Sequence, residues 1–172
     1  MKLIKSFEIF EGLLKPRDLS GRKAQYANHY NKIVNDSIPW TTDTANEMFD
    51  RLSTRKSLSN LMKFSKFDIV DDKTLEIHTE HTVRHPNKKD TSVYKFTNIL
   101  QISKNIDTIG YIYNCKILST STNTNNSRTN TDESSITKLH IHWLYEFIEN
   151  TASNQYQEAY ADNISDPPNY GM

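Results

Sequence analysis

Apolar and polar residues alternate almost without interruption between positions 74 and 85 of this chain. One side of that segment carries Leu75, Ile77, Thr79, His81 and Val83. Strict alternation over such a length predicts a half-buried β-strand. Similar patterns predict strands over residues 92–103 and 109–120, and the dense apolar content of residues 136–147 predicts a last strand buried on both faces. The end of that last segment, residues 143–148, could instead be helical.

The residues that precede these strands have helical periodicity. Apolar positions recur every three to four residues near the N-terminus, at Leu3, Phe7, Phe10 and Leu14, and predict one face of a short helix. Residues 22–34 predict a second helix, and Pro39 makes the segment after it extended. A third helix is predicted from an N-cap at Asp43 or Thr44, with Glu47 at capping-box spacing, to about residue 64.

The order of these segments, helices first and then consecutive strands, favours an α+β fold whose antiparallel sheet curls around its own helices or around a ligand. A length of 172 residues fits one domain. Residues 1–21 are interpreted as an N-terminal helical extension, 22–150 as the domain, and 151–172 as a flexible tail. Residues 119–135 contain no apolar side chain, and they predict a polar loop rich in Ser, Thr and Asn.

The charge of the chain is balanced, with 21 basic and 21 acidic residues. Nucleic-acid binding needs a basic surface that displaces counterions from phosphates, and no basic stripe is visible, so we expect no nucleic-acid partner. No apolar run approaches the roughly 20 residues that a membrane-spanning helix needs, so we expect no membrane association. Cys115 is the only cysteine, which excludes an internal disulfide and fits a reducing compartment. We therefore expect a cytoplasmic or nuclear protein.

His81 is the histidine that most strongly suggests chemistry. It lies on the apolar side of its predicted strand, where a neutral imidazole could act as a general acid or base near pH 7. A histidine at the edge of the core, hydrogen-bonded to a neighbour, gives the same pattern. His140, His142 and Glu146 have the spacing of metal ligands on a strand. Paired histidines on a solvent-facing strand also explain that spacing, and we expect no metal and no cofactor.

Two polar residues fall on the apolar side of other predicted strands. Asn98 alternates with Phe96 and Leu100, and Tyr113 alternates with Cys115. An amide or phenol that is buried without a partner costs about 1–3 kcal/mol. These residues therefore pair with each other or line a pocket in which a ligand or water completes the hydrogen bonding. The predicted pocket residues are Tyr30, Trp40, Phe96, Asn98 and Tyr113.

Several segments together resemble the nuclear transport factor 2-like superfamily, which includes SnoaL-like cyclases, ketosteroid isomerases and scytalone dehydratase. These segments are the extended SIPWTT, the helical TANEMFDRL, and the strands TLEIHTEHTVRHP, SVYKFTNILQIS and TIGYIYNCKIL. The resemblance covers residues 22–147 and rests on the order of the elements. It implies a cone-shaped α+β barrel, in which N-terminal helices pack in the concave face of a strongly curved antiparallel sheet. For the enzymes of the superfamily it implies a His/Asp or Asp/Tyr pair in the pocket.

No aspartate falls on the apolar side of a long predicted strand, which argues against ketosteroid isomerase chemistry. We therefore expect a non-catalytic binding or scaffold protein with a hydrophobic pocket for a small hydrophobic ligand. A homodimer or another protein complex is expected to form through the sheet face. The aromatic residues expected at that interface are Tyr111, Tyr113, Trp143 and Tyr145. The alternative is a lyase or isomerase in which His81 is the general base and Tyr113 or Tyr30 donates the proton.

Overall fold

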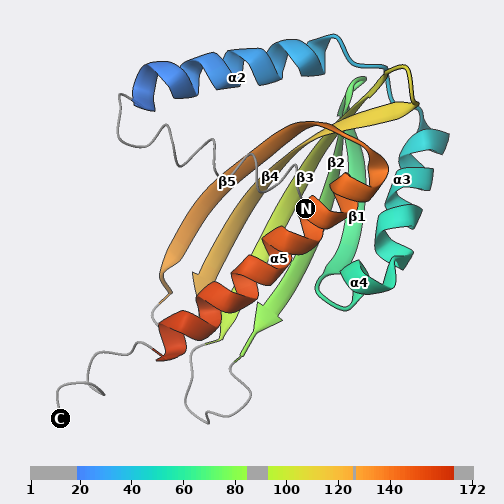
Figure 1. Cartoon of the computed structure of the whole chain (residues 1–172). Helices are drawn as coiled ribbons and strands as arrows, with labels where there is room; N and C mark the ends of the chain where they lie inside the picture. Colours follow the sequence, from blue (N-terminus) through green and yellow to red (C-terminus); the bar gives the residue numbers. More distant parts are fainter. Residues whose placement is uncertain (1–18, 85–92, 126, 165–172) are drawn as a thin grey trace, which may run out of the picture.

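The computed structural model of this protein describes residues 19–84, 93–125 and 127–164 (Figure 1). That part of the chain forms a five-stranded antiparallel sheet with helices, which confirms the predicted α+β class. The helices are α2 (Leu19–Asn35), α3 (Thr42–Thr54), α4 (Lys56–Ser59) and α5 (Ile141–Ile164). The strands are β1 (Lys63–Asp71), β2 (Thr74–Val83), β3 (Tyr94–Ile106), β4 (Tyr111–Asn123) and β5 (Thr129–Leu139). The helix expected near residues 3–14 lies outside the described residues.

The strands follow one another across the sheet in the order of the sequence, from β1 to β5. Each strand pairs antiparallel with the next, so opposing residues form rows that cross the sheet, such as Leu75, Ile102 and Cys115 on the face toward the core. The sheet is curved, but its edge strands β1 and β5 do not pair with each other. The structure therefore shows a curved, open antiparallel sheet and not a closed barrel.

The C-terminal α5 lies across the core face of the sheet, a position that the family resemblance does not imply (Figure 1). α5 lies against β2, β4 and β5, and α3 packs against β1. Met48 and Leu52 of α3 and Leu58 of α4 contribute to the same core, whereas α2 passes above one end of the sheet. Of the predicted N-terminal helices, α3 therefore packs on the sheet together with α5, and the packing of such helices in the concave face of a cone stays a prediction.

Residues 119–135, which the sequence predicts as a polar loop, lie mostly in strands. β4 continues to Asn123 and β5 begins at Thr129, so the segment forms the end of a β-hairpin. The hydrogen bonds between strands join backbone N–H and C=O groups, which polar residues carry as apolar ones do. Threonine also favours strands, because its branched side chain fits the pleated surface. The prediction of a loop is wrong because a lack of apolar residues indicates exposure, which a solvated strand also has.

The segment predicted as the last strand changes conformation near its middle. β5 ends at Leu139, and the carbonyl of His140 accepts hydrogen bonds from the N–H groups of Trp143 and Leu144 at the start of α5. The helical interpretation of residues 143–148 is therefore confirmed, and a strand that continues to residue 147 is wrong.

The tail expected over residues 151–172 is helical as far as Ile164, where α5 ends. Buried positions recur along this part with helical spacing, at Ala152, Gln155 and Ala159. They hold the helix against the sheet, which corrects the prediction of a flexible tail for residues 151–164. Residues 165–172 lie outside the described part of the chain.

α3 begins with a reciprocal capping pair that differs from the predicted one. Thr41 is the N-cap; its hydroxyl accepts a hydrogen bond of 3.2 Å from the Thr44 N–H, and the Thr44 hydroxyl accepts one of 3.0 Å from the Thr41 N–H. This arrangement satisfies two N–H groups that the helix itself leaves unpaired. The helical stretch ends at Ser59, earlier than expected, and Phe64 lies in β1.

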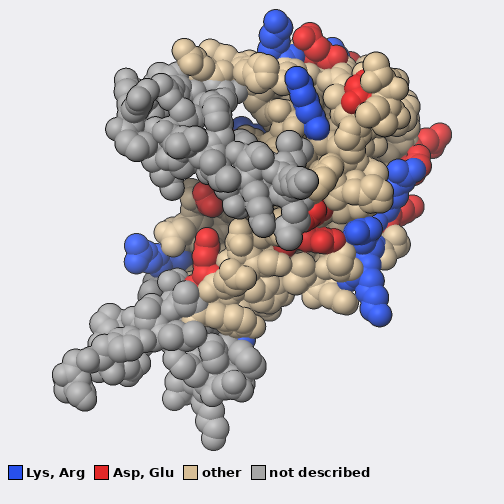
Figure 2. Space-filling model, viewed as in Figure 1, with Lys and Arg blue, Asp and Glu red and all other residues tan. Residues whose placement is uncertain are grey.

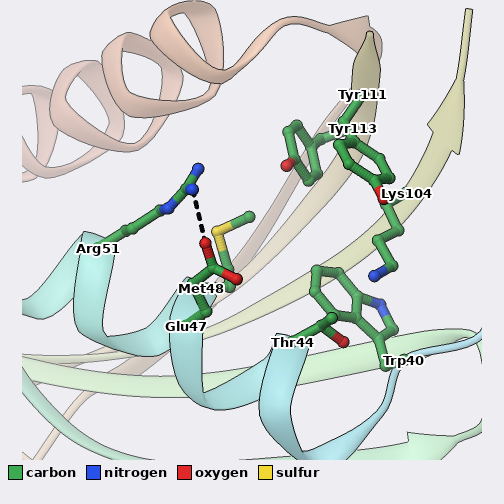
Figure 3. A pocket seen from close by; sticks show the side chains of 8 residues that line it. All are labelled: Trp40, Thr44, Glu47, Met48, Arg51, Lys104, Tyr111 and Tyr113. Carbon is green, nitrogen blue, oxygen red and sulfur yellow. Dashed lines mark hydrogen bonds and ion pairs between the residues drawn. The ribbon is translucent and has the colours of Figure 1, made fainter.

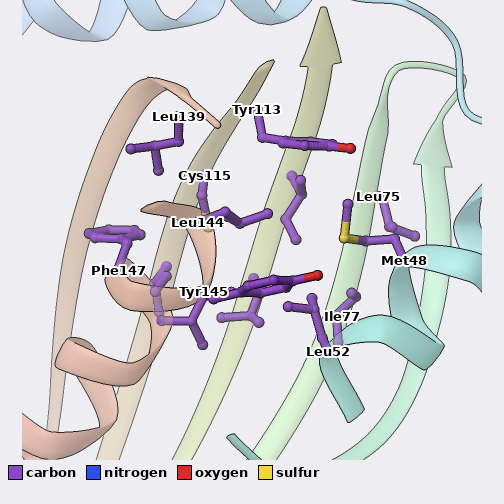
Figure 4. Packing of buried hydrophobic residues seen from close by; sticks show 14 of the residues in the cluster. Met48, Leu52, Leu75, Ile77, Tyr113, Cys115, Leu139, Leu144, Tyr145 and Phe147 are labelled. Carbon is purple, nitrogen blue, oxygen red and sulfur yellow. The ribbon is translucent and has the colours of Figure 1, made fainter. Parts of the chain in front are cut away.

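The main core lies between the sheet, α3 and α5 (Figure 4). Cys115 is fully buried in it, and burial raises the pKa of the thiol, which keeps it protonated. Tyr113 and Tyr145, expected at an exposed interface, are buried here as well, while Tyr111 is exposed. The predicted aromatic interface is therefore corrected, because two of its residues belong to the interior.

Charged side chains of both signs are interspersed on the face shown in Figure 2, and the described residues of that face form no extended patch of one sign. In the described part of the chain, no helix combines the length and the apolar character that crossing a bilayer requires.

Candidate functional site

A cleft opens at the end of the sheet where β3 and β4 approach the first turns of α3 (Figure 3). We call it the Lys104 cleft. Its volume is about 100 Å³, and it is lined by Trp40, Thr44, Glu47, Met48, Arg51, Lys104, Tyr111 and Tyr113. Trp40, Lys104 and the two tyrosines form one wall, and Glu47, Met48 and Arg51 of α3 face them (Figure 3).

Hydrogen bonds fix the position of Trp40 in the wall of the cleft. Ile38 forms an isolated antiparallel bridge with Lys104, in which the Ile38 N–H donates to the Lys104 carbonyl at 2.8 Å. The Trp40 N–H donates to the Asp72 carbonyl at 2.6 Å, and the Trp40 Nε1–H donates to the Ile102 carbonyl at 3.0 Å. The ring hydrogen bond thus holds the indole against β3, and the backbone hydrogen bond ties Trp40 to the turn between β1 and β2.

Lys104 is a buried cation that forms no ion pair within the described part of the chain. It lies on the core side of β3, opposite Tyr113 of β4, and only 6% of its surface is exposed. Its Nζ lies 4.5 Å from the centroid of the Trp40 ring and 5.6 Å from that of Tyr111, within the range of cation–π interactions. No ion pair joins it to a carboxylate of the described residues. Burial lowers the pKa of Lys104, and the charge of Glu47 partly offsets that effect.

On the opposite wall, formed by α3, the two charged side chains form an ion pair with each other. Arg51 Nη2 lies 2.6 Å from Glu47 Oε1, one helical turn away on α3, and both side chains are largely exposed. Met48 is buried between them. Burial raises the pKa of Tyr113, so its hydroxyl is protonated at neutral pH and can donate a hydrogen bond. Among the residues that line the cleft, Lys104 therefore carries the uncompensated charge.

His81 lies outside this cleft, in a stack of aromatic rings. Its ring centroid is 5.0 Å from that of Phe96 and 5.1 Å from that of Tyr156, and the planes are nearly parallel. Both imidazole nitrogens are buried, and neither has a hydrogen-bond partner among the described residues. Burial lowers the pKa of His81 to about 4, so the ring is neutral at pH 7. A general base must reach the proton that it removes, and this location gives His81 no such access.

The predicted catalytic residues His81 and Tyr113 are not brought together. His81 of β2 pairs with Phe96, and Tyr113 of β4 pairs with Lys104. Both partners, Phe96 and Lys104, belong to β3. Eight residues separate these two positions of β3, which corresponds to about 26 Å along an extended strand. The prediction that the two side chains act on one substrate is therefore corrected by the register of the sheet.

The predicted pocket residues are also divided. Trp40 and Tyr113 line the Lys104 cleft together, and Phe96 belongs to the stack around His81. Tyr30 lies on α2, where Lys116 Nζ is 6.0 Å from the centroid of its ring. Because Lys116 alternates with core-facing residues of β4, this contact lies on the other face of the sheet.

Asn98 is satisfied by protein groups and leaves nothing for a ligand to complete. Its Oδ1 accepts hydrogen bonds of 2.7 Å from both Gln155 Nε2 and Ser119 Oγ. Its Nδ2 donates to Thr79 Oγ1 at 3.3 Å. Thr79, Asn98 and Ser119 form one row across β2, β3 and β4. The network explains the inward amide without Tyr113 and without a pocket.

Sequence reasoning missed two residues that matter here, Lys104 and Gln155. The predicted strand ends at residue 103, although the alternation that includes Leu100 and Ile102 continues to Lys104. Gln155 falls within the predicted tail, although it stands three residues after Ala152 in a series at helical spacing. The alternation up to Lys104 and the helical spacing up to Gln155 are both present in the sequence. A charged or polar residue at an apolar position is nevertheless easily interpreted as the end of a strand or helix.

His140 and His142 do not share a strand face, because β5 ends at Leu139. His140 Nε2 instead lies 3.7 Å from Asp107 Oδ2. Across the described ranges of the chain, no group of three or more His, Cys, Asp or Glu residues is arranged to hold a metal ion.

A second hollow, of about 230 Å³, crosses strands β1 to β4. Its ionisable side chains are paired with neighbours, as Lys66 with Asp68, Glu80 with Lys63 and His78 with Glu76. A balanced and partly exposed set of charges gives no preference for a ligand. The Lys104 cleft is smaller but holds the unpaired buried charge, and we therefore place the candidate site there.

Comparisons of the chain with protein-family models, with curated proteins and with solved structures found no match. The resemblance to the nuclear transport factor 2-like superfamily therefore stays a prediction.

Proposed function

We propose that this protein is a non-catalytic binding protein whose ligand presents a carboxylate to the Lys104 cleft. The observation that carries the proposal is the buried Lys104 ammonium, which has no ion pair with any described residue. Burying a charge is unfavourable unless it is paired, and aromatic faces compensate for only part of the lost hydration. A carboxylate that enters the cleft supplies the missing partner.

The remaining walls suit a small acid with an apolar body. Trp40, Tyr111 and Tyr113 offer ring surfaces, and Met48 offers a thioether at the base. Since one water occupies about 30 Å³ in the liquid, a cleft of about 100 Å³ holds a carboxylate and a few carbon atoms. The proposal keeps the predicted small hydrophobic ligand and adds an acidic group to it. The curved antiparallel sheet supports a nuclear transport factor 2-like fold as a further part of the proposal.

Catalysis has less support. A lyase or isomerase that uses His81 as base needs that imidazole to contact the substrate, and the ring is enclosed between Phe96 and Tyr156. The carboxylate nearest to Lys104 in the cleft, that of Glu47, is engaged by Arg51. The cleft therefore offers a charge and a shape for binding, without a free base beside them.

Tryptophan fluorescence tests the proposal. The chain has two tryptophans, so W143F leaves Trp40 as the reporter of the cleft. Acetate, propionate and benzoate should change its emission in a saturable way at pH 7, whereas propionamide, which lacks the charge, should not. K104M should abolish the response. K116M is the matched control, because Lys116 lies on the other face and pairs with Glu133 at 3.2 Å. A lack of saturable response to every acid would refute the proposal.

A further inference from the structure

The hairpin that joins β3 to β4 ends in an exposed apolar tip. Among the described residues, the large apolar side chains that are exposed are Val70 at 57%, Ile106 at 63%, Ile109 at 81% and Tyr111 at 53%. Three of these four belong to residues 106–111. Single exposed apolar side chains are common on proteins, but a cluster of three beside a cleft is typical of an interaction surface.

Hydrogen bonds define the shape of this tip. Asp107 Oδ1 accepts from the N–H groups of Ile109 at 2.8 Å and Gly110 at 3.0 Å, and the Asp107 N–H donates to the Gly110 carbonyl at 2.9 Å. Gly110 has φ of +148°, a conformation that glycine adopts without strain. The turn therefore presents Ile109 to solvent in a fixed position, which lowers the entropy that binding must remove.

The tip and the Lys104 cleft form one continuous surface. Ile106 follows Lys104 by two residues on β3, so the two side chains leave the same face about 7 Å apart. Ile106 also stands opposite Tyr111, which lines the cleft. A ligand whose acid group reaches Lys104 therefore continues directly over Ile106 and Tyr111.

We infer that the ligand is a peptide segment of a partner protein, which inserts a glutamate or aspartate side chain into the cleft and lays its neighbouring apolar side chains on the tip. This inference rests on the proposed function and names the ligand of the same site. The volume of the cleft fits one acidic side chain, and the peptide main chain stays outside it. Charge complementarity comes from Lys104, and apolar contact comes from Ile106, Ile109 and Tyr111.

The open tip favours a peptide over a fatty acid with the same carboxylate. An acyl chain laid across Ile109 keeps one side in water, because that residue is 81% exposed. A protein partner covers the tip from outside and removes both apolar surfaces from water, which is the main favourable contribution to such an interface.

Two pools of short fluorescein-labelled peptides test the inference. Both pools are acetylated at the N-terminus and amidated at the C-terminus, and carry mixed Leu, Ile, Val and Phe around a central residue. That residue is Glu in one pool and Gln in the other, so a side chain supplies the one carboxylate that differs. Fluorescence anisotropy should show at least about tenfold tighter binding of the Glu pool, because a desolvated charge pair is lost with Gln.

Three variants separate the contributions of the cleft and the tip. I109S should weaken the binding of the Glu pool by about fivefold or more, because apolar area is lost, and should leave propionate binding unchanged. V70S is the matched control, because Val70 is also exposed but lies on β1, away from the tip, and it should change neither affinity. K104M should abolish the binding of both ligands.

The outcomes distinguish this inference from the proposed function. If propionate binds but the Glu and Gln pools bind equally, or if I109S leaves the Glu-pool affinity unchanged, the peptide inference is wrong and the proposed function stands. If the Gln pool made without C-terminal amidation binds and the amidated Glu pool does not, the acidic side chain is the wrong source of the carboxylate. If octanoate binds more tightly than the Glu pool and I109S weakens it, the ligand is a fatty acid. If neither propionate nor the Glu pool binds, both proposals fail.

Discussion

Gln155 of α5 donates a hydrogen bond of 2.7 Å from its Nε2 to the Oδ1 of Asn98, at the centre of the sheet. Both side chains are buried, and the same Nε2 also donates to Ser119 Oγ at 3.0 Å. The C-terminal helix is thus attached to β3 and β4 by a polar network as well as by apolar packing. Since a buried amide tolerates few arrangements of its partners, this network fixes the position of α5 along the sheet.

Replacing Asn98 by leucine should lower the free energy of unfolding by about 2–4 kcal/mol, because the buried Gln155 and the half-buried Ser119 both lose their partner. Urea unfolding followed by circular dichroism measures the loss. The double variant N98L/Q155L should recover part of it, because two apolar side chains then face each other. A double variant that loses the sum of both single effects would show that the network is not the cause.

His81 should make the stability of the protein depend on pH. Its pKa is about 4 in the folded state and 6.5 as the ordinary value, so between these values the unfolded state binds more protons and stability falls as the pH falls. The expected loss between pH 8 and pH 5 is about 2 kcal/mol. H81F should remove this contribution and should be at least as stable as the parent at pH 7, because two unpaired nitrogens leave the interior.

Urea unfolding at pH 8 and pH 5 measures the contribution of His81 as the difference between the parent and H81F. H78F is the control, because His78 lies on the opposite, more exposed face of β2. Identical pH dependence in the parent and H81F would contradict the assignment.

K104M should stabilise the ligand-free protein while it abolishes carboxylate binding. Methionine has a similar length and removes a buried charge that no described carboxylate pairs with, so a gain of about 1 kcal/mol is expected. For a chain of this size that gain corresponds to a rise in Tm of about 2–4 °C. Thermal unfolding with K116M as control measures the effect, and a lower Tm in K104M would show that the ammonium is already compensated.

Carboxylate binding should weaken at high pH, because it needs the charged form of Lys104. Burial lowers the pKa of Lys104 from its ordinary value of 10.5, so the loss of propionate affinity should begin below pH 10.5. Bound carboxylate favours the ammonium and should raise that pKa. Fluorescence titrations of propionate between pH 6 and pH 11 measure the profile. An affinity that stays constant to pH 11 would remove Lys104 as the binding group.

The variant A159E should strongly destabilise the protein, because the end of α5 is packed on the sheet. Ala159 is buried against Val83 and Phe96, so A159E places a charge in an apolar cluster and should cost about 3 kcal/mol or more. Q157E adds the same charge at an exposed position of the same helix and should change stability by less than about 0.5 kcal/mol. Chemical unfolding measures the stability of both variants. Equal free energies of unfolding for A159E and Q157E would indicate that this part of α5 does not pack on the sheet.

The sequence allowed the α+β class, the strand β2 and the inward register of Asn98 to be predicted, because each depends on local alternation. α5 could not be separated from a strand on the same grounds, since a short apolar run after residue 136 fits either structure. The polar hairpin was equally ambiguous, because Ser, Thr and Asn occupy exposed strands and loops alike. The choice between them depends on pairing with β4, which is a long-range property.

The residues of the candidate site were also predictable only in part. Trp40 and Tyr113 could be identified as aromatic residues on inward registers. The burial of Lys104 could not, because the rings that cover it come from Trp40, far away along the chain, and from Tyr111 on the next strand. A lysine near the end of a strand is usually solvated. Only the arrangement of the surrounding elements shows that this one is enclosed.

The fully buried thiol of Cys115 can report how often the core of this protein opens. It is the only thiol in the chain and lies in the core beside Leu144 of α5. An alkylating reagent reaches its sulfur only when α5 moves away from β4 or the sheet separates, so the rate of alkylation measures how often that opening occurs. Mass spectrometry of the wild-type chain can therefore time these openings without an introduced label, and a ligand that slows them reveals its own binding.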